Sequence, residues 1–162
     1  MGLLDTSDWG EARWIAYFDS TQPPAADRHF GYQSWIGKSA DDVKWVSVDL
    51  GQSREIDSVK LYPVTPYIRP DKPYGATGWH PNEIGFLFPL RFKIETSENA
   101  DFSDAFTVVD CTGADVPNPG NEVQVYRFKP VQAQYVRITV TRLVHRLRGL
   151  YGFALAEMEV YS

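Results

Sequence analysis

The chain has 162 residues, of which 43% are hydrophobic and 23% charged, and its formal net charge is -5 at pH 7. This length favours one domain with a single core. The acidic balance argues against a nucleic-acid partner, which requires a basic face, and no apolar run approaches the roughly 18 residues needed to span a membrane. We therefore expect residues 1–162 to form one domain that binds neither nucleic acid nor membrane.

The start of the chain and its cysteine content bear on the compartment. The opening "MGLLDTSDWGE" lacks the basic segment and the long apolar stretch of a signal peptide. Cys111 is the single cysteine, so an intramolecular disulfide and a cysteine-based zinc site are excluded. It lies in "FTVVDCTG", where we expect a buried or half-buried small apolar residue.

Alternation of apolar and polar residues predicts about eight strands. In chain order the first is "ARWIAYFD" at 12–19, followed by 43–51 and 55–64, which "GQSR" separates and which we interpret as consecutive strands joined by a turn. The later strands are predicted at 90–97, 105–112, 122–130, 134–143 and 151–162. "NADFSDA" predicts a short helical turn and no longer helix is expected. Strands without intervening helices indicate an all-β antiparallel β-sandwich.

The stretch from Pro63 to Pro89 is predicted to be one long loop, with six of the eleven prolines and three of the twelve glycines. A loop longer than about 15 residues in a compact domain is either functional or disordered. Disordered segments are poor in aromatic residues, whereas this one is rich in them. We therefore expect an ordered functional loop. The alternative is a flap that seals one side of the sandwich.

Catalytic signatures are weak. The three histidines, His29, His80 and His145, lie far apart and form no metal-binding motif. Glu157 and Glu159 would share one face of a strand, with α-carbons roughly 7 Å apart, near a separation that glycosidases use. Neighbouring carboxylates on an exposed strand are nevertheless common. We therefore expect a binding protein rather than an enzyme.

Four motifs resemble those of discoidin-type modules, the fold shared by coagulation-factor C domains and many bacterial carbohydrate-binding modules. They occur in the family's order within residues 43–162 and read "WVSVDLGQSREIDSVKLYPV", "FPLRFKIETSENADFSD", "QYVRITVTRL" and "YGFALAEMEVYS". The resemblance implies a galactose-binding-domain-like jelly roll.

The segments "LLDTSDWGEARWIAYFD", "GFLFPLRFKIE" and "RLVHRLRGLYGFALAEMEVYS" are similar to modules of bacterial α-L-rhamnosidases. This resemblance implies L-rhamnose as ligand, calcium in sugar recognition, and a place within a larger secreted enzyme, outside the cell or in the periplasm. The module would be monomeric on its own and would target an attached glycoside hydrolase to a plant polysaccharide.

Many relatives carry a "DG..T.W" segment that helps to hold a structural calcium. The corresponding segment here, "DRHFGYQSWIGKSADDVKW", retains Asp27 and Trp35 but lacks an aligned Gly and Thr. Glu157 matches the C-terminal Glu that often completes the site. The resemblance thus implies calcium at Asp27 and Glu157, although calcium takes six to eight oxygen ligands and the sequence does not identify that many.

In the discoidin fold, loops at one end of the sandwich carry the ligand, so we expect 19–34, 63–89 and 143–151 to converge. A Tyr or Trp face stacks on the apolar face of a sugar, while Arg, Asp and Asn satisfy its hydroxyls. Prolines in the loop lower the entropy lost on binding. The expected ligand-binding residues are Tyr67, Arg69, Asp71, Tyr74, Trp79, His80, Asn82, Glu83, Arg146, Arg148 and Tyr151.

Alternatives remain for several of these residues. Trp79 would equally pack against the sandwich, and Arg146 and Arg148 would equally form a solvated basic turn. Asp71, Asn82 and Glu83 would bind calcium or sugar, or stay solvated. Phe86 and Phe88 are expected in the core, with Phe86 or Tyr74 also able to contact the methyl group of rhamnose.

Three functions compete at this point. The first is a non-catalytic carbohydrate-binding module. The second is a discoidin-type adhesion module that binds protein or membrane, for which apolar spikes and basic residues on short loops would be expected. The third is a small glycosidase, which would need a carboxylate pair in a cleft.

Overall fold

The structure is a computed structural model that describes residues 4–5, 32–34, 36–64, 85–147 and 149–162. These residues form strands and no helix, so the predicted all-β class is confirmed. The predicted strand at 12–19 and residues 65–84 of the long loop lie outside the described part. Within that part, no helix has the length and apolarity to cross a membrane. The strands are β1 Leu4–Asp5, β2 Tyr32–Gln33, β3 Lys44–Tyr62, β4 Arg91–Ser97, β5 Phe106–Cys111, β6 Gln124–Arg142, β7 Val144–Leu147, β8 Leu150–Gly152, β9 Ala154–Leu155 and β10 Glu157–Tyr161.

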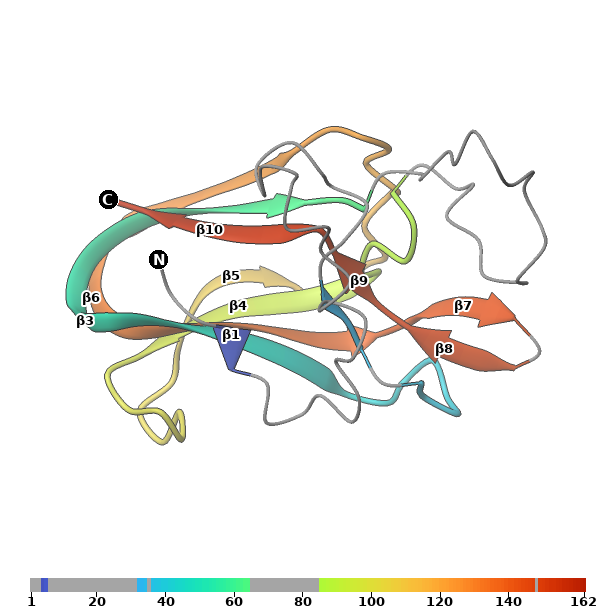
Figure 1. Ribbon diagram of the computed structural model, residues 1–162, viewed down its shortest axis with the longest axis horizontal. Coiled ribbons are helices and arrows are strands. Elements are labelled where there is room, and N and C mark those ends of the chain that lie inside the picture. The colour runs from blue at the N-terminus through green and yellow to red at the C-terminus, as the bar shows by residue number, and fades with distance from the viewer. Residues whose placement is uncertain (1–3, 6–31, 35, 65–84, 148) are drawn as a thin grey trace, which may run out of the picture.

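Two long strands, β3 and β6, belong to both layers of the sandwich. They pair antiparallel along most of their length and curve together at one side of the molecule (Figure 1). In one layer the strand order is β1-β3-β6-β4-β5, and in the other β10 pairs with the last residues of β3. The sandwich is therefore built by folding one strand pair over onto itself.

The predicted turn at "GQSR" is wrong, because 43–51 and 55–64 form one strand. β3 advances from Asp49 to Arg54 while its partner advances only from Tyr135 to Ala133. The extra residues form an irregularity that bends β3, with Gly51 at a φ of 80° and its N–H bonded to the Asp49 carboxylate at 2.7 Å. Glycine and a short polar side chain suit a bulge as well as a turn.

The predicted break between 122–130 and 134–143 is absent for the same reason. β6 runs through this region, and its register with β3 shifts between Ile56 and Ser58. Pro130 lies opposite this shift, where the missing N–H of proline costs no ladder bond. The predicted strands at 90–97 and 105–112 are confirmed as β4 and β5. The single strand predicted at 151–162 is wrong, because this stretch is divided among β8, β9 and β10, which pair with three different strands, β7, β2 and β3.

The core lies between the two layers. Its largest fully buried side chains include Phe92, Phe153, Leu61 and Ile138, and each contributes about 1.5–3 kcal/mol by leaving water. The expectation for Phe88 is confirmed, since it is 4% exposed. A smaller apolar cluster of Val64, Leu87 and Ala154 lies beside the core, and the half-buried Phe86 packs against it rather than in the main core. Cys111 is half-buried, as expected.

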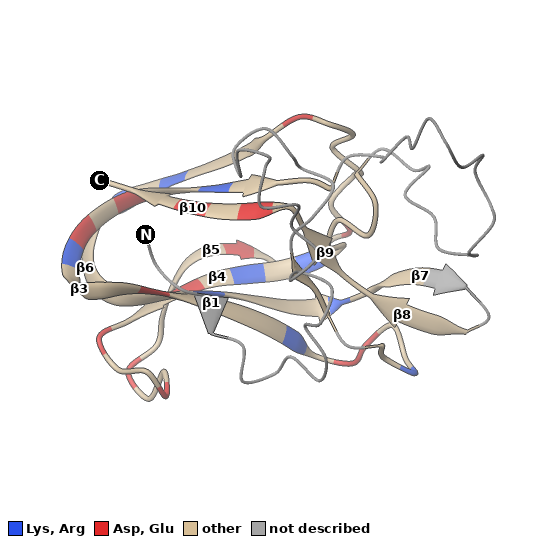
Figure 2. Ribbon diagram, in the orientation of Figure 1, with Lys and Arg blue, Asp and Glu red and all other residues tan. Residues whose placement is uncertain are grey.

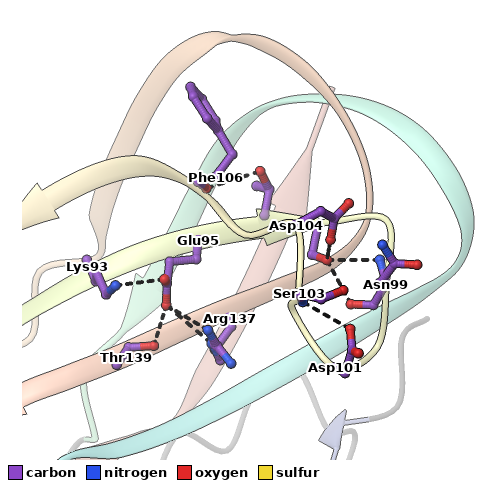
Figure 3. A network of polar contacts seen from close by, with 11 residues as sticks. Lys93, Glu95, Asn99, Asp101, Ser103, Asp104, Phe106, Arg137 and Thr139 are labelled. Carbon is purple, nitrogen blue, oxygen red and sulfur yellow. Dashed lines mark hydrogen bonds and ion pairs between the residues drawn. The ribbon is translucent and has the colours of Figure 1, made fainter.

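The predicted helical turn at 99–105 is also wrong. Two successive turns occur there, closed by Phe102 N–H to Asn99 carbonyl (3.0 Å) and Ala105 N–H to Phe102 carbonyl (3.2 Å). Phe102 has a φ of 56°, which no right-handed helix allows. Short polar side chains compete for the backbone here, as Asp101 does by accepting the Ser103 N–H at 2.9 Å (Figure 3).

Candidate functional site

One end of the sandwich brings together the described flanks of the three predicted loops. The segment 150–155 contacts all of them (Figure 1). Phe153 accepts the Ser34 N–H at 2.9 Å, Ala154 donates to the Leu87 carbonyl at 2.9 Å, and Leu150–Gly152 pairs with β7. Val64 and Phe86, near the two ends of the 65–84 segment, form a bridge. The fold thus places these flanks on one scaffold.

The β7–β8 hairpin presents an aromatic pair at this end. His145 is opposite Tyr151 in the register, and their ring centroids lie 5.3 Å apart at 70°. Gly149 occupies the turn with a φ of 74°, and its N–H donates to Nε2 of His145 at 3.4 Å. His145 is exposed, whereas Tyr151 is half-buried and packs against the core. The pair offers an aromatic face together with a hydrogen-bonding edge.

The structure describes few of the predicted ligand residues. Tyr151 lies on β8 as part of the aromatic pair, and the backbone of Arg146 lies on β7. His145 was missed as a ligand candidate; the signal for it was the hairpin sequence "VHRLRGLYG", whose register places it opposite Tyr151. The remaining predicted ligand residues lie outside the described part: Tyr67, Arg69, Asp71, Tyr74, Trp79, His80, Asn82, Glu83 and Arg148.

Glu157 and Glu159 lie on β10, in the other part of the sandwich (Figure 2). Oε2 of Glu159 accepts the hydroxyls of Tyr62 (2.5 Å) and Tyr161 (2.6 Å). The hydrogen bond to Glu159 is the main cause that raises the pKa of Tyr62 to about 12. Partial burial and then the Glu159 charge raise the pKa of Glu157. This is a hydrogen-bonded patch on a sheet face.

A calcium site is not assembled by the described residues. Among them, no three His, Cys, Asp or Glu side chains group in a way that could hold a metal ion. Glu157 supplies carboxylate oxygens, which calcium prefers, but Asp27 lies outside the described part.

Glu95 is the most enclosed carboxylate that the structure describes, at 4% exposure. Lys93 Nζ lies 2.7 Å from Oε1, while Arg137 Nη2 (3.1 Å) and Thr139 Oγ1 (2.6 Å) contact Oε2 (Figure 3). Burial acts to raise the pKa of Glu95, but the hydrogen bonds from Lys93 and Thr139 and the charge of Arg137 outweigh it and lower the pKa. Arg137 also lies over the Phe102 ring, 4.0 Å from its centroid. Glu95 therefore ties β4 to β6 and is held as an anion.

The chain is similar to known proteins in its three-dimensional fold. No family model matches it, and no curated protein does. A family 32 carbohydrate-binding module of a family 31 glycoside hydrolase from Clostridium perfringens superposes with a TM-score of 0.58 at 18% identity, over 84% of this chain and 77% of that one. The C. perfringens NanJ family 32 module, in complex with galactose, gives 0.52 at 19%, over 89% and 88%.

A third C. perfringens module, in complex with GalNAc-beta-1,3-galactose, gives a TM-score of 0.54 at 13% identity, over 85% of this chain and 78% of that chain. At identities this low, the three superpositions establish a common fold and nothing beyond it. The chain therefore has the antiparallel β-sandwich fold of family 32 carbohydrate-binding modules.

Proposed function

We propose that this protein is a non-catalytic carbohydrate-binding module whose ligand binds at the end of the sandwich formed by the β7–β8 hairpin. The observation that carries the proposal is the His145–Tyr151 pair, with rings 5.3 Å apart, on a hairpin next to the flanks of the long aromatic loop. The fold supports it, because the galactose and GalNAc-beta-1,3-galactose complexes are formed by modules of the same fold.

Binding of a sugar would involve stacking and hydrogen bonds and would break no covalent bond. A sugar ring stacks its apolar face on a tyrosine, and its hydroxyls exchange hydrogen bonds with imidazole, guanidinium and carboxylate groups. L-rhamnose remains our preferred ligand, with the aromatic and polar residues of the 63–89 loop completing the site around Tyr151.

Two of the described carboxylates are already engaged by neighbouring side chains, which favours binding over catalysis at these two positions. Glu95 is occupied by Lys93, Arg137 and Thr139. Oε2 of Glu159 is occupied by two phenolic hydroxyls. Neither offers the free acid and base that glycoside hydrolysis requires.

Calcium stays a prediction of the sequence resemblance, tied to Asp27 and Glu157. The same holds for the larger setting that we propose: a monomeric module that targets an attached glycoside hydrolase to its polysaccharide, outside the cell or in the periplasm.

A glycan array tests the proposal, run with and without a chelator and accompanied by an aryl-glycoside hydrolysis assay. We expect binding to at least one glycan containing rhamnose or galactose, with a monosaccharide Kd of about 10 µM to 1 mM because so small a ligand buries few atoms, and no hydrolysis. Binding to lipid vesicles or to protein without any glycan binding would overturn the proposal in favour of an adhesion module. Turnover lost in Glu157→Gln would overturn it in favour of a glycosidase.

A further inference from the structure

The loop 37–42, "GKSADD", contacts the hairpin at two points. Gly37 N–H donates to the Tyr151 carbonyl at 2.8 Å, and Tyr151 N–H donates back to the Gly37 carbonyl at 3.0 Å. Leu143 N–H, directly before β7, donates to the Ala40 carbonyl at 2.7 Å. The loop is therefore hydrogen-bonded to the residue directly before β7 and to Tyr151 in the middle of β8.

The Asp42 side chain bonds to the backbone at the start of this loop. Oδ2 of Asp42 accepts the backbone N–H groups of Lys38 (2.8 Å) and Ser39 (3.3 Å). Hydrogen bonds to a carboxylate are roughly twice as strong as neutral ones. The Lys38 N–H and the Gly37 carbonyl belong to one peptide group, so the Asp42 carboxylate holds the same peptide whose carbonyl accepts the Tyr151 N–H.

The packing around Gly37 leaves too little space for a Cβ atom unless a neighbouring side chain shifts. A Cβ on Gly37 would lie 2.9 Å from Oδ2 of Asp42 and 2.9 Å from Cδ1 of Leu143, closer than real Cβ contacts come. A side chain at position 37 would therefore force the Asp42 carboxylate or the buried Leu143 side chain to shift.

We infer that Asp42 is a positioning residue for sugar binding, acting through Gly37 to hold Tyr151 in its orientation on the hairpin. The inference rests on the proposed function and extends it to a residue that touches no ligand. Asp41, the next residue, is the matched control: its side chain is 76% exposed, and it reaches the neighbouring strand only through a 3.5 Å ion pair with Arg142, a class of contact that contributes little.

The first measurement is hydrogen exchange of the Tyr151 amide in the sugar-free protein. Asp42→Ala should accelerate that exchange about tenfold or more, because it removes both charge-assisted bonds from the loop backbone to the carboxylate. Asp42→Asn, which keeps an acceptor oxygen, should recover part of the protection, and Asp41→Ala should stay within about twofold of the parent. Gly37→Ala, whose methyl group would displace the carboxylate, should reproduce Asp42→Ala.

The second measurement is calorimetric titration with L-rhamnose and with D-galactose in the parent, Asp42→Ala, Tyr151→Ala and the double variant. Asp42→Ala should weaken binding about fivefold to tenfold and should add nothing in the Tyr151→Ala background, because residues that act as one unit are non-additive.

Three outcomes would overturn the inference, and they are distinguishable. If the parent binds neither sugar, the proposed function falls and the positioning role falls with it. If the parent binds and Asp42→Ala binds equally well, the positioning role alone falls. If the Tyr151 amide exchanges at the parent rate in both Asp42→Ala and Gly37→Ala, the loop does not hold Tyr151.

Discussion

The body of the sandwich and its hairpin end are held in different ways. In the body, β3 and β6 bury complementary apolar faces, and even the charged Glu95 is enclosed and paired with Lys93 and Arg137. At the hairpin end, His145 is exposed and Tyr151 half-buried, and the backbone of Tyr151 is hydrogen-bonded to a loop. The comparison suggests that changes in the body cost stability, whereas changes at the end cost binding.

The largest effect should come from Phe92→Ala in the body. Phe92 is fully buried between Phe88 (6.3 Å) and Tyr126 (5.7 Å), measured between ring centroids. Loss of the ring should lower the free energy of unfolding by about 3–5 kcal/mol, measured by denaturant titration. Val125→Ala is the control, since Val125 is 47% exposed and should change the value by less than about 0.5 kcal/mol. Equal effects at the two positions would contradict the placement of the core.

Glu95→Gln should have the next largest effect, about 1–3 kcal/mol at pH 7, because it leaves Lys93 and Arg137 without an anion. The folded pKa of Glu95 is lowered from the ordinary 4.5. Its stabilisation is therefore complete above pH 4.5 and is lost as the pH falls through the lowered value. The parent should lose stability over that acidic range, and the variant should lose less. A variant whose stability falls with acid as steeply as that of the parent would count against this role.

His145→Ala should separate the two regions in the opposite direction. It removes the exposed ring that faces Tyr151 and the acceptor for Gly149 N–H. We expect sugar affinity to fall about threefold to tenfold, in line with the loss of one aromatic contact, and the melting temperature to change little. The pair of measurements is calorimetric titration beside thermal unfolding. A large fall in melting temperature without a change in affinity would assign His145 to the body.

The smallest effect on binding is expected from Glu159→Gln on β10. Removing the carboxylate charge should let the pKa of Tyr62 return from about 12 toward 10, seen by ultraviolet titration of phenolate absorbance. Sugar affinity should not change, because β10 lies apart from the hairpin. Lost affinity would place the ligand on the sheet face instead.

Strands and core positions that depend on local alternation of apolar and polar residues could be predicted from the sequence. β4 and β5 were predicted to within one residue at each end, and Phe88 was correctly expected in the core. The two long strands, β3 and β6, were each predicted as two separate strands, because "GQSR" and Pro130 carry the same local signals in a bulge as in a turn. A bulge is told from a turn by its pairing with the partner strand, and the local sequence carries no information on that pairing.

At the candidate site too, some residues could be predicted from the sequence and others could not. Tyr151 was expected to bind ligand because of the sequence resemblance, and this stays a prediction. His145 required the hairpin register, and the roles of Gly37 and Asp42 required contacts between a loop and a strand far along the chain. Such contacts follow from packing rather than from any motif.

Sugar binding at Tyr151 is tested by calorimetric titration of the parent and Tyr151→Ala with L-rhamnose and D-galactose, with cooperative unfolding as the check on folding. We expect the parent to bind at least one of the two sugars, and the variant, still cooperatively folded, to bind it about tenfold or more weakly. A folded Tyr151→Ala that binds the sugar as the parent does would contradict it.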